Sequence, residues 1–87
     1  MTKNYALITG STAGIGLDIA RELASRGHNI LLTARREDRL KDIAERLTLD
    51  FGVHTDYVVA DLSEPSAPGT IFNFCDTHQY AVNILVN

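Results

Sequence analysis

Short apolar runs alternate along the chain with longer segments in which apolar residues recur every three or four positions. The apolar runs predict buried strands over 5–8, 28–34, 53–60 and 81–86. The segments between them predict amphipathic helices over 15–26, 35–51 and 70–78. Strands that alternate with helices are typical of a parallel sheet built from right-handed crossover connections.

The helix boundaries are marked by glycine, serine and proline. Gly27 is suited to a left-handed cap after the first helix, and Gly52 is expected to end the second. Ser63 is suited to the N-cap of the third helix. The pair Pro68-Gly69 then predicts a delay or break, so that the regular helix covers 70–78.

The predicted elements fit an α/β doubly wound sheet with four strands in the order 3-2-1-4 and three helices. Ligands bind such sheets beyond the carboxyl ends of the strands, where the strand order reverses. That point lies between the first and fourth strands. The segment that follows Ile8 is therefore expected to lie beside Asn87.

Three glycines occupy the turn from the first strand to the first helix, at Gly10, Gly14 and Gly16. Glycine there permits a positive φ and the close approach of a ligand. The helix start behind the turn offers unpaired N–H groups and the positive end of a dipole, which suit a pyrophosphate. No Gly-Lys-Ser/Thr follows, which argues against a P-loop. The alternative is a tight turn with no ligand.

Arg35 and Arg36 follow the second strand, where dinucleotide-binding folds usually place an acid that holds the ribose 2′-hydroxyl. A guanidinium binds a 2′-phosphate through two charge-assisted hydrogen bonds, whereas an acid repels it. The pair therefore predicts a preference for NADP(H) over NAD(H). The alternative is that both arginines are only the solvated start of a helix.

Asp61 and Leu62 follow the third strand, and Asn87 follows the fourth. Asp61 is suited to accept a hydrogen bond from the adenine amino group while Leu62 packs on the ring; the alternative is a turn or capping carboxylate. Asn87 is suited to brace the glycine turn, or it is only a strand terminus.

Composition limits the other possibilities. The 87 residues form one small domain, and the formal charge of −3 argues against a nucleic-acid or anionic-membrane surface. The lone Cys75 excludes an internal disulfide and is expected in the core rather than as a nucleophile. The three histidines are scattered, so no metal site is expected. We see no signal peptide or membrane span, and expect a cytoplasmic protein.

Four motifs resemble those of the short-chain dehydrogenase/reductase family and follow one another in the family's order. They are Thr-Gly-x-x-x-Gly-Ile-Gly at 9–16, Ala-Arg-Arg at 34–36, Ala-Asp-Leu at 60–62 and Asn-Ile-Leu-Val-Asn at 83–87, and the resemblance extends over all 87 residues. The resemblance implies that 1–87 is the NADP-binding, Rossmann-type half of an oxidoreductase that transfers hydride between NADP(H) and a carbonyl or alcohol. The cofactor-binding residues that it implies are Gly10, Ser11, Thr12, Gly14, Ile15, Gly16, Arg35, Arg36, Asp61, Leu62 and Asn87.

The family's catalytic serine and its Tyr-x-x-x-Lys pair match no residues here, since neither Lys3 nor Lys41 follows a tyrosine by four positions. No catalytic residue is therefore assigned, and the chain is predicted to be inactive alone. Two alternatives are a stand-alone nucleotide-binding module and a relic whose glycine turn is structural.

The last predicted strand, 82–86, lies at an edge of the sheet and contains neither lysine nor proline. An unprotected edge strand is a template for pairing with another chain. One helix must also cover a whole face of the sheet beside Phe72 and Phe74. We therefore expect a homo-oligomer that forms through this edge or face; the alternative is a C-terminal half of the protein that covers both.

Overall fold

The computed structural model of the protein describes residues 3–10 and 14–87. Strands and helices alternate along the chain without exception. In order, they are β1 (Lys3–Thr9), α1 (Gly14–Ser25), β2 (Asn29–Ala34), α2 (Glu37–Phe51), β3 (Thr55–Val59), α3 (Ala67–His78) and β4 (Tyr80–Val86).

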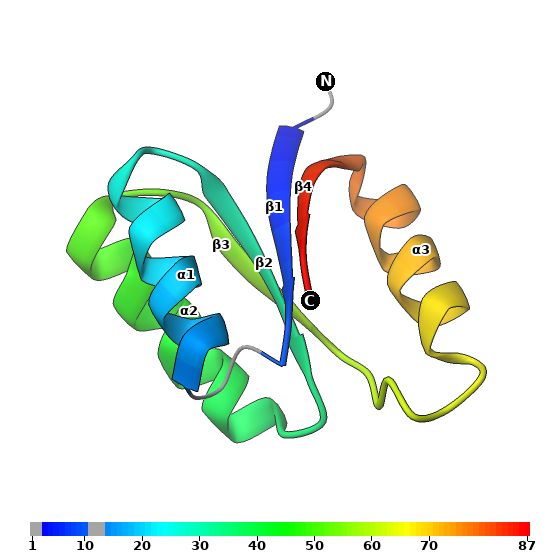
Figure 1. Ribbon diagram of the computed structural model, residues 1–87. Coiled ribbons are helices and arrows are strands. Elements are labelled where there is room, and N and C mark those ends of the chain that lie inside the picture. Colours follow the sequence, from blue (N-terminus) through cyan, green and yellow to red (C-terminus); the bar gives the residue numbers. More distant parts are fainter. Residues whose placement is uncertain (1–2, 11–13) are drawn as a thin grey trace.

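The four strands form one parallel sheet in the order β3-β2-β1-β4, which confirms the predicted doubly wound topology. The helices α1 and α2 pack on one face of this sheet, and α3 packs on the other (Figure 1). The carboxyl ends of β1, β2 and β4 consequently lie at one end of the sheet. The register between β1 and β4 shifts once, between Tyr5 and Ala6.

Alternate residues of the strands face the two helical layers, as a period of two requires. On β1, Ala6 and Ile8 belong to the larger core cluster under α1 and α2, whereas Tyr5 and Leu7 belong to the smaller cluster under α3. Ala20 is fully buried in α1, and so small a side chain lets the helix approach the sheet closely.

The third helix starts earlier than its sequence predicts. It begins at Ala67, so the predicted start at Thr70 is wrong. Pro68 lies in the first turn, where no intrahelical hydrogen bond needs its missing N–H, and therefore does not break the helix. The predicted N-cap at Ser63 is also wrong, because Ser66 occupies that position.

The second helix ends where it was predicted to end. Gly52 caps α2 in the left-handed conformation, with a φ of 71°, and its N–H donates to the Thr48 carbonyl oxygen at 2.8 Å. Glycine adopts this conformation without the steric cost that a side chain would add.

Beneath α3, Tyr80 of β4 is hydrogen-bonded to a strand that is not its neighbour in the sheet. Its hydroxyl donates to Oδ2 of Asp56 in β3 at 2.8 Å. Its ring lies 4.1 Å from the Tyr5 ring, centroid to centroid. Burial, followed by hydrogen bonds with Tyr5 and Asp56, raises the pKa of Tyr80 well above its usual value. The folded chain thus strongly favours the neutral phenol.

We expect Tyr80→Phe to lower the free energy of unfolding by about 1–2 kcal/mol at pH 7, because a hydrogen bond to a carboxylate is lost. In the parent chain, Tyr80 should contribute its full stabilisation below about pH 10, the ordinary pKa of tyrosine. Above that pH the free energy of unfolding should fall, since only the unfolded chain then loses the Tyr80 proton.

Urea unfolding of both chains at several pH values up to 11 measures these effects. Tyr57→Phe is the matched control, because the Tyr57 hydroxyl makes no hydrogen bond within the described residues. An alkaline loss of stability that persists equally in Tyr80→Phe would contradict the assignment to Tyr80.

Candidate functional site

The carboxyl ends of the first three strands border one open groove of about 290 Å³. Its walls are formed by the residues that follow each strand, together with the last residues of β2 and the loop after β3. The lining residues are Gly10, Ala34, Arg35, Arg36, Ala60, Asp61, Leu62 and Ser63. The topology therefore brings together five of the residues predicted to bind cofactor, which are Gly10, Arg35, Arg36, Asp61 and Leu62.

Gly10 joins the end of β1 to the end of β2. Its φ is +63°, and its N–H donates to the Thr33 carbonyl oxygen at 3.1 Å. A Cβ built at Gly10 would meet nothing within 4 Å, so backbone conformation rather than space requires glycine here. The chain consequently turns sharply out of the sheet without placing a side chain at the groove.

Gly14, Ile15 and Gly16 form the first turn of α1, and two further predicted residues, Ser11 and Thr12, lie outside the described residues. The first turn of α1 contains no acidic side chain. Its partial positive charge is therefore not offset by a carboxylate in that turn, which favours the binding of an anion. The Ile15 side chain is 78% exposed.

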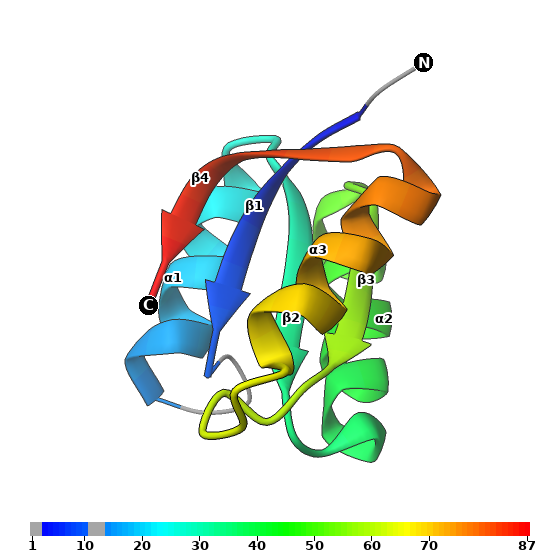
Figure 2. The same ribbon diagram turned by 90° about the vertical axis from the view of Figure 1, so that its right-hand side faces the viewer.

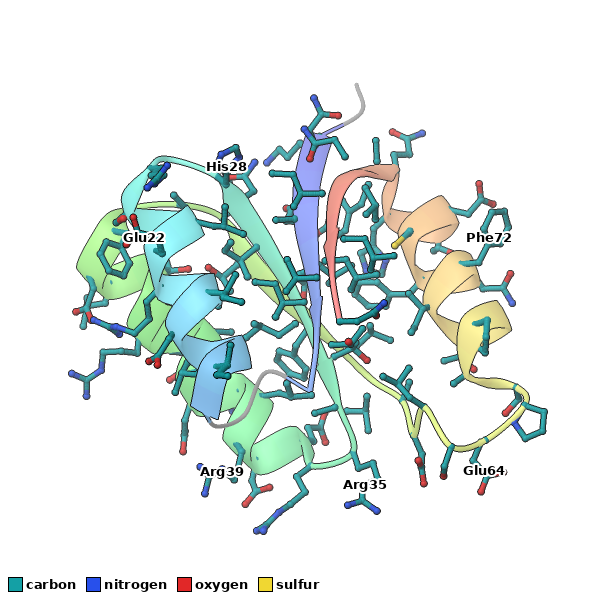
Figure 3. All side chains as sticks on the ribbon, viewed as in Figure 1. Glu22, His28, Arg35, Arg39, Glu64 and Phe72 are labelled. Carbon is teal, nitrogen blue, oxygen red and sulfur yellow. The ribbon has the colours of Figure 1, made fainter. Side chains whose placement is uncertain are left out.

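The two arginines differ in their surroundings. Arg36 is the N-cap residue of α2, and its Nη2 lies 3.5 Å from Oδ2 of Asp38 in an exposed pair. The Arg35 side chain is exposed and makes no hydrogen bond within the described residues. In Figure 3, Arg35 extends from the end of the sheet toward solvent, on the side of the loop that carries Glu64. Arg35 thus offers at the groove a guanidinium that is not hydrogen-bonded to any described residue, whereas Arg36 partly fits the alternative of a solvated helix start.

Asp61 forms a local turn with Ser63. Its Oδ1 accepts hydrogen bonds from the Ser63 backbone N–H at 3.0 Å and from the Ser63 hydroxyl at 2.7 Å. The hydrogen bond from the Ser63 hydroxyl, and then that from its backbone N–H, lower the pKa of Asp61. Burial opposes this shift, and the Arg35 charge, the weakest of the four causes, adds to it. The alternative of a turn carboxylate is therefore observed, although Asp61 also lines the groove. Leu62, next to it, is 49% exposed.

Asn87 lies outside the groove, beside the end of β1. The Thr9 hydroxyl lies 3.2 Å from the Asn87 Oδ1 and 3.2 Å from the Val86 carbonyl oxygen. These two acceptors share one hydroxyl proton. Asn87 thus contacts Thr9, the residue before Gly10, through its side chain. Residues 11–13 of the glycine turn, which Asn87 was predicted to brace, lie outside the described residues.

Sequence reasoning missed Thr9 and Ser63 as parts of this site. The spacing Asp-x-Ser at 61–63 is a signal for Ser63, since aspartate commonly accepts hydrogen bonds from the residue two positions later. Thr9 carries a weaker signal, because its partner is distant in sequence.

Other chemistries lack support in the part of the chain that the structure describes. Within 3–10 and 14–87, no group of histidine, cysteine, aspartate and glutamate side chains is arranged to hold a metal ion. Burial raises the pKa of the Cys75 thiol, which disfavours the nucleophilic thiolate. None of the described helices is both long and apolar enough to span a membrane.

Comparison with known proteins agrees with the topology. The sequence model of the short chain dehydrogenase family matches residues 4–87. The chain is 46% identical over 59 residues to the human protein named inactive hydroxysteroid dehydrogenase-like protein 1, covering 68% of this chain and 18% of that protein. It is 37% identical over 68 residues to 7beta-hydroxysteroid dehydrogenase of Collinsella aerofaciens, covering 78% and 26%.

Solved structures show the same relationship. The chain superposes on L-sorbose reductase from Gluconobacter frateurii, solved in complex with NADPH and L-sorbose, with a TM-score of 0.91 and 37% identity. The match covers 99% of this chain and 33% of the reductase. The chain thus spans a third or less of the length of these three relatives. The sequence match, the strand order and the structural superposition together establish that the chain belongs to the short chain dehydrogenase family.

Proposed function

We propose that this chain is the cofactor-binding part of an NADP-dependent oxidoreductase that transfers hydride between NADP(H) and a carbonyl or alcohol. The observation that carries the proposal is the exposed Arg35 guanidinium at a groove lined by Gly10 and Asp61. NADPH in the related L-sorbose reductase supports this choice of cofactor. When bound, the nicotinamide supplies the hydride chemistry, and the residues described here bind and orient the cofactor.

Each part of the cofactor has a proposed partner. The pyrophosphate and adjoining ribose would be held by the glycine turn and the start of α1, the 2′-phosphate by the two arginines, and the adenine by the loop after β3. In chain order, the proposed residues are Gly10, Ser11, Thr12, Gly14, Ile15, Gly16, Arg35, Arg36, Asp61 and Leu62. Asn87 would hold the end of β1 from outside the groove. The lone cysteine fits a reducing compartment, and we place the protein in the cytoplasm.

A stand-alone nucleotide-binding module is the second candidate. The human relative, whose name includes the word inactive, favours it, because the same fold there carries no activity by name. The two candidates agree on cofactor binding and differ on turnover. Binding is therefore tested first.

We expect the chain to bind NADPH at least about tenfold more tightly than NADH, because the 2′-phosphate adds charge-assisted hydrogen bonds of about 1.5–3 kcal/mol. Arg35→Asp should reverse this preference, since it replaces an attractive charge by a repulsive one. Calorimetric titration of both cofactors against both chains measures the change. Arg46→Asp, on α2 outside the groove, is the control with the same change of charge. Equal affinity of the parent chain for NADPH and NADH would contradict the proposal.

We expect the 87-residue chain to oxidise NADPH no faster than buffer does in the presence of carbonyl compounds. None of its three tyrosines precedes a lysine by four positions. A positioned acid–base group typically contributes about 10²–10⁴-fold to the rate. Absorbance at 340 nm follows the reaction, with a known NADPH-dependent reductase as the positive control. A rate that rises in proportion to the concentration of the chain would contradict this expectation.

We also propose that the chain self-associates through β4. In the sheet, β4 is an edge strand. In Figure 2, α3 lies in front of β2 and β3, and the later part of β4 extends away from the helix. The rings of Phe74 and His78 in α3 contact Tyr80 at the start of β4. Three large apolar side chains near this edge are more than two-fifths exposed: Phe72 at 68%, Val82 at 42% and Leu85 at 60%. An apolar edge without lysine or proline invites pairing with another chain.

Sedimentation velocity at micromolar concentration should therefore detect dimers or larger species. Leu85→Lys should shift the chain toward the monomer, because it places a charge on the edge strand. Leu49→Lys is the control, since Leu49 is 82% exposed on α2, away from β4. A monomeric parent chain would show the proposal of a homo-oligomer to be wrong.

A further inference from the structure

We propose that Ser63 is a positioning residue for adenine, which holds the Asp61 carboxylate in the orientation that accepts the adenine amino group. The inference rests on the proposed function. It goes further by assigning adenine selectivity to a residue whose own side chain is not required to touch the ligand. Both residues line the groove.

The geometry of the turn fixes one carboxylate oxygen and leaves the other available. Ser63 donates twice to Oδ1 of Asp61, through its N–H at 3.0 Å and its hydroxyl at 2.7 Å. Oδ2 has no hydrogen-bond donor within the described residues. Two donors on one oxygen restrict rotation about both side-chain bonds of Asp61. The remaining acceptor is therefore held in place before a ligand arrives.

Ordering the carboxylate in advance has a measurable consequence for binding. A mobile side chain that a ligand must immobilise costs about 0.5–1.5 kcal/mol of binding free energy. Ser63 removes part of that cost, because the carboxylate is already restrained in the free protein. The backbone N–H of residue 63 would remain after a substitution, so the hydroxyl accounts for only a share of the effect.

Charge also favours adenine over other purines. An aspartate is ionised at neutral pH, and the Ser63 hydrogen bonds lower the pKa of Asp61 further, so its carboxylate can only accept hydrogen bonds. Adenine presents an amino donor at its sixth position, whereas hypoxanthine presents a carbonyl acceptor there. An ionised Asp61 therefore attracts the amino group of adenine and repels the carbonyl oxygen of hypoxanthine.

Neighbouring groups do not duplicate the role of Ser63. The Glu64 N–H donates to the Asp61 main-chain oxygen at 2.9 Å and leaves the carboxylate untouched. Arg35 influences Asp61 through its charge, as the last and weakest of the causes that lower its pKa. Ser66, in the same loop, makes no side-chain capping hydrogen bond. Among the described side chains, Ser63 alone donates to the Asp61 carboxylate.

The test compares NADPH with reduced nicotinamide hypoxanthine dinucleotide phosphate, in which a carbonyl replaces the amino group at the sixth position of the purine and the adjacent N1 carries a proton. We expect Ser63→Ala to weaken NADPH binding about 3–10-fold, as the loss of one preorganising hydrogen bond implies. Affinity for the hypoxanthine ligand should change less than twofold. Ser63→Thr, which keeps the hydroxyl, should restore NADPH binding, and Ser66→Ala should match the parent chain.

Each other outcome overturns a specific statement. If the parent chain binds NADPH and Ser63→Ala binds it with the same affinity, the inference is overturned and the proposed function stands. The same holds where Ser63→Ala weakens both ligands equally, because that pattern reports general damage to the loop. A parent chain that binds neither ligand overturns the proposed function, and the inference with it. Urea unfolding of each variant shows separately whether the fold is intact.

Discussion

The structure depends on the pairing of β1 with a strand on each side. Because β1 is bonded to β2 and to β4 in parallel, the carboxyl ends of these three strands are fixed at one end of the sheet. Hydrogen bonds then join the strands at that end. The Gly10 N–H donates to the Thr33 carbonyl oxygen, and the Thr9 hydroxyl lies within hydrogen-bonding distance of Val86 and Asn87. The groove depends on the β1–β2 pairing and on the further pairing of β2 with β3, since its walls are the segments that leave these three strands.

Much of the fold and the location of the site could be predicted because both follow from local patterns. The apolar runs identify the strands, the topology orders them, and residues such as Arg35 and Asp61 meet because each directly follows a strand. The predicted start of α3 is wrong because proline usually interrupts a helix, whereas the first turn of a helix tolerates it. Ser63 was misplaced as a cap for a related reason. Its donors are directed at Asp61, which a sequence pattern alone does not show.

The contacts that could not be predicted join residues far apart in sequence. Thr9 and Asn87 are separated by 78 positions, and Asp56 and Tyr80 by 24. Periodicity determines which face of the sheet a side chain occupies, but rotamers and strand twist determine which atoms come within hydrogen-bonding distance. Side-chain geometry also distinguishes Arg35 from Arg36. The two residues are adjacent in sequence, but the Arg36 guanidinium lies near Asp38 and the Arg35 side chain is exposed at the groove.

The Asp56 carboxylate distinguishes the two edges of the sheet. Even-numbered residues of the β3 segment point their backbone N–H and C=O groups toward β2: the His54 carbonyl oxygen accepts from Ile30, and the Ala60 N–H donates to Ala34. The N–H of the odd-numbered Tyr57 therefore points away from β2, toward the outer edge of the sheet. That N–H donates to Oδ1 of Asp56 at 2.8 Å, while Oδ2 accepts from Tyr80. One outward donor of β3 is therefore already occupied, whereas no side chain among the described residues donates to or accepts from the outer edge of β4 in this way. In a two-fold pair formed through β4, as proposed above, the outer edges would both be β3, and the bonded Tyr57 N–H would be one donor fewer for the addition of a further strand.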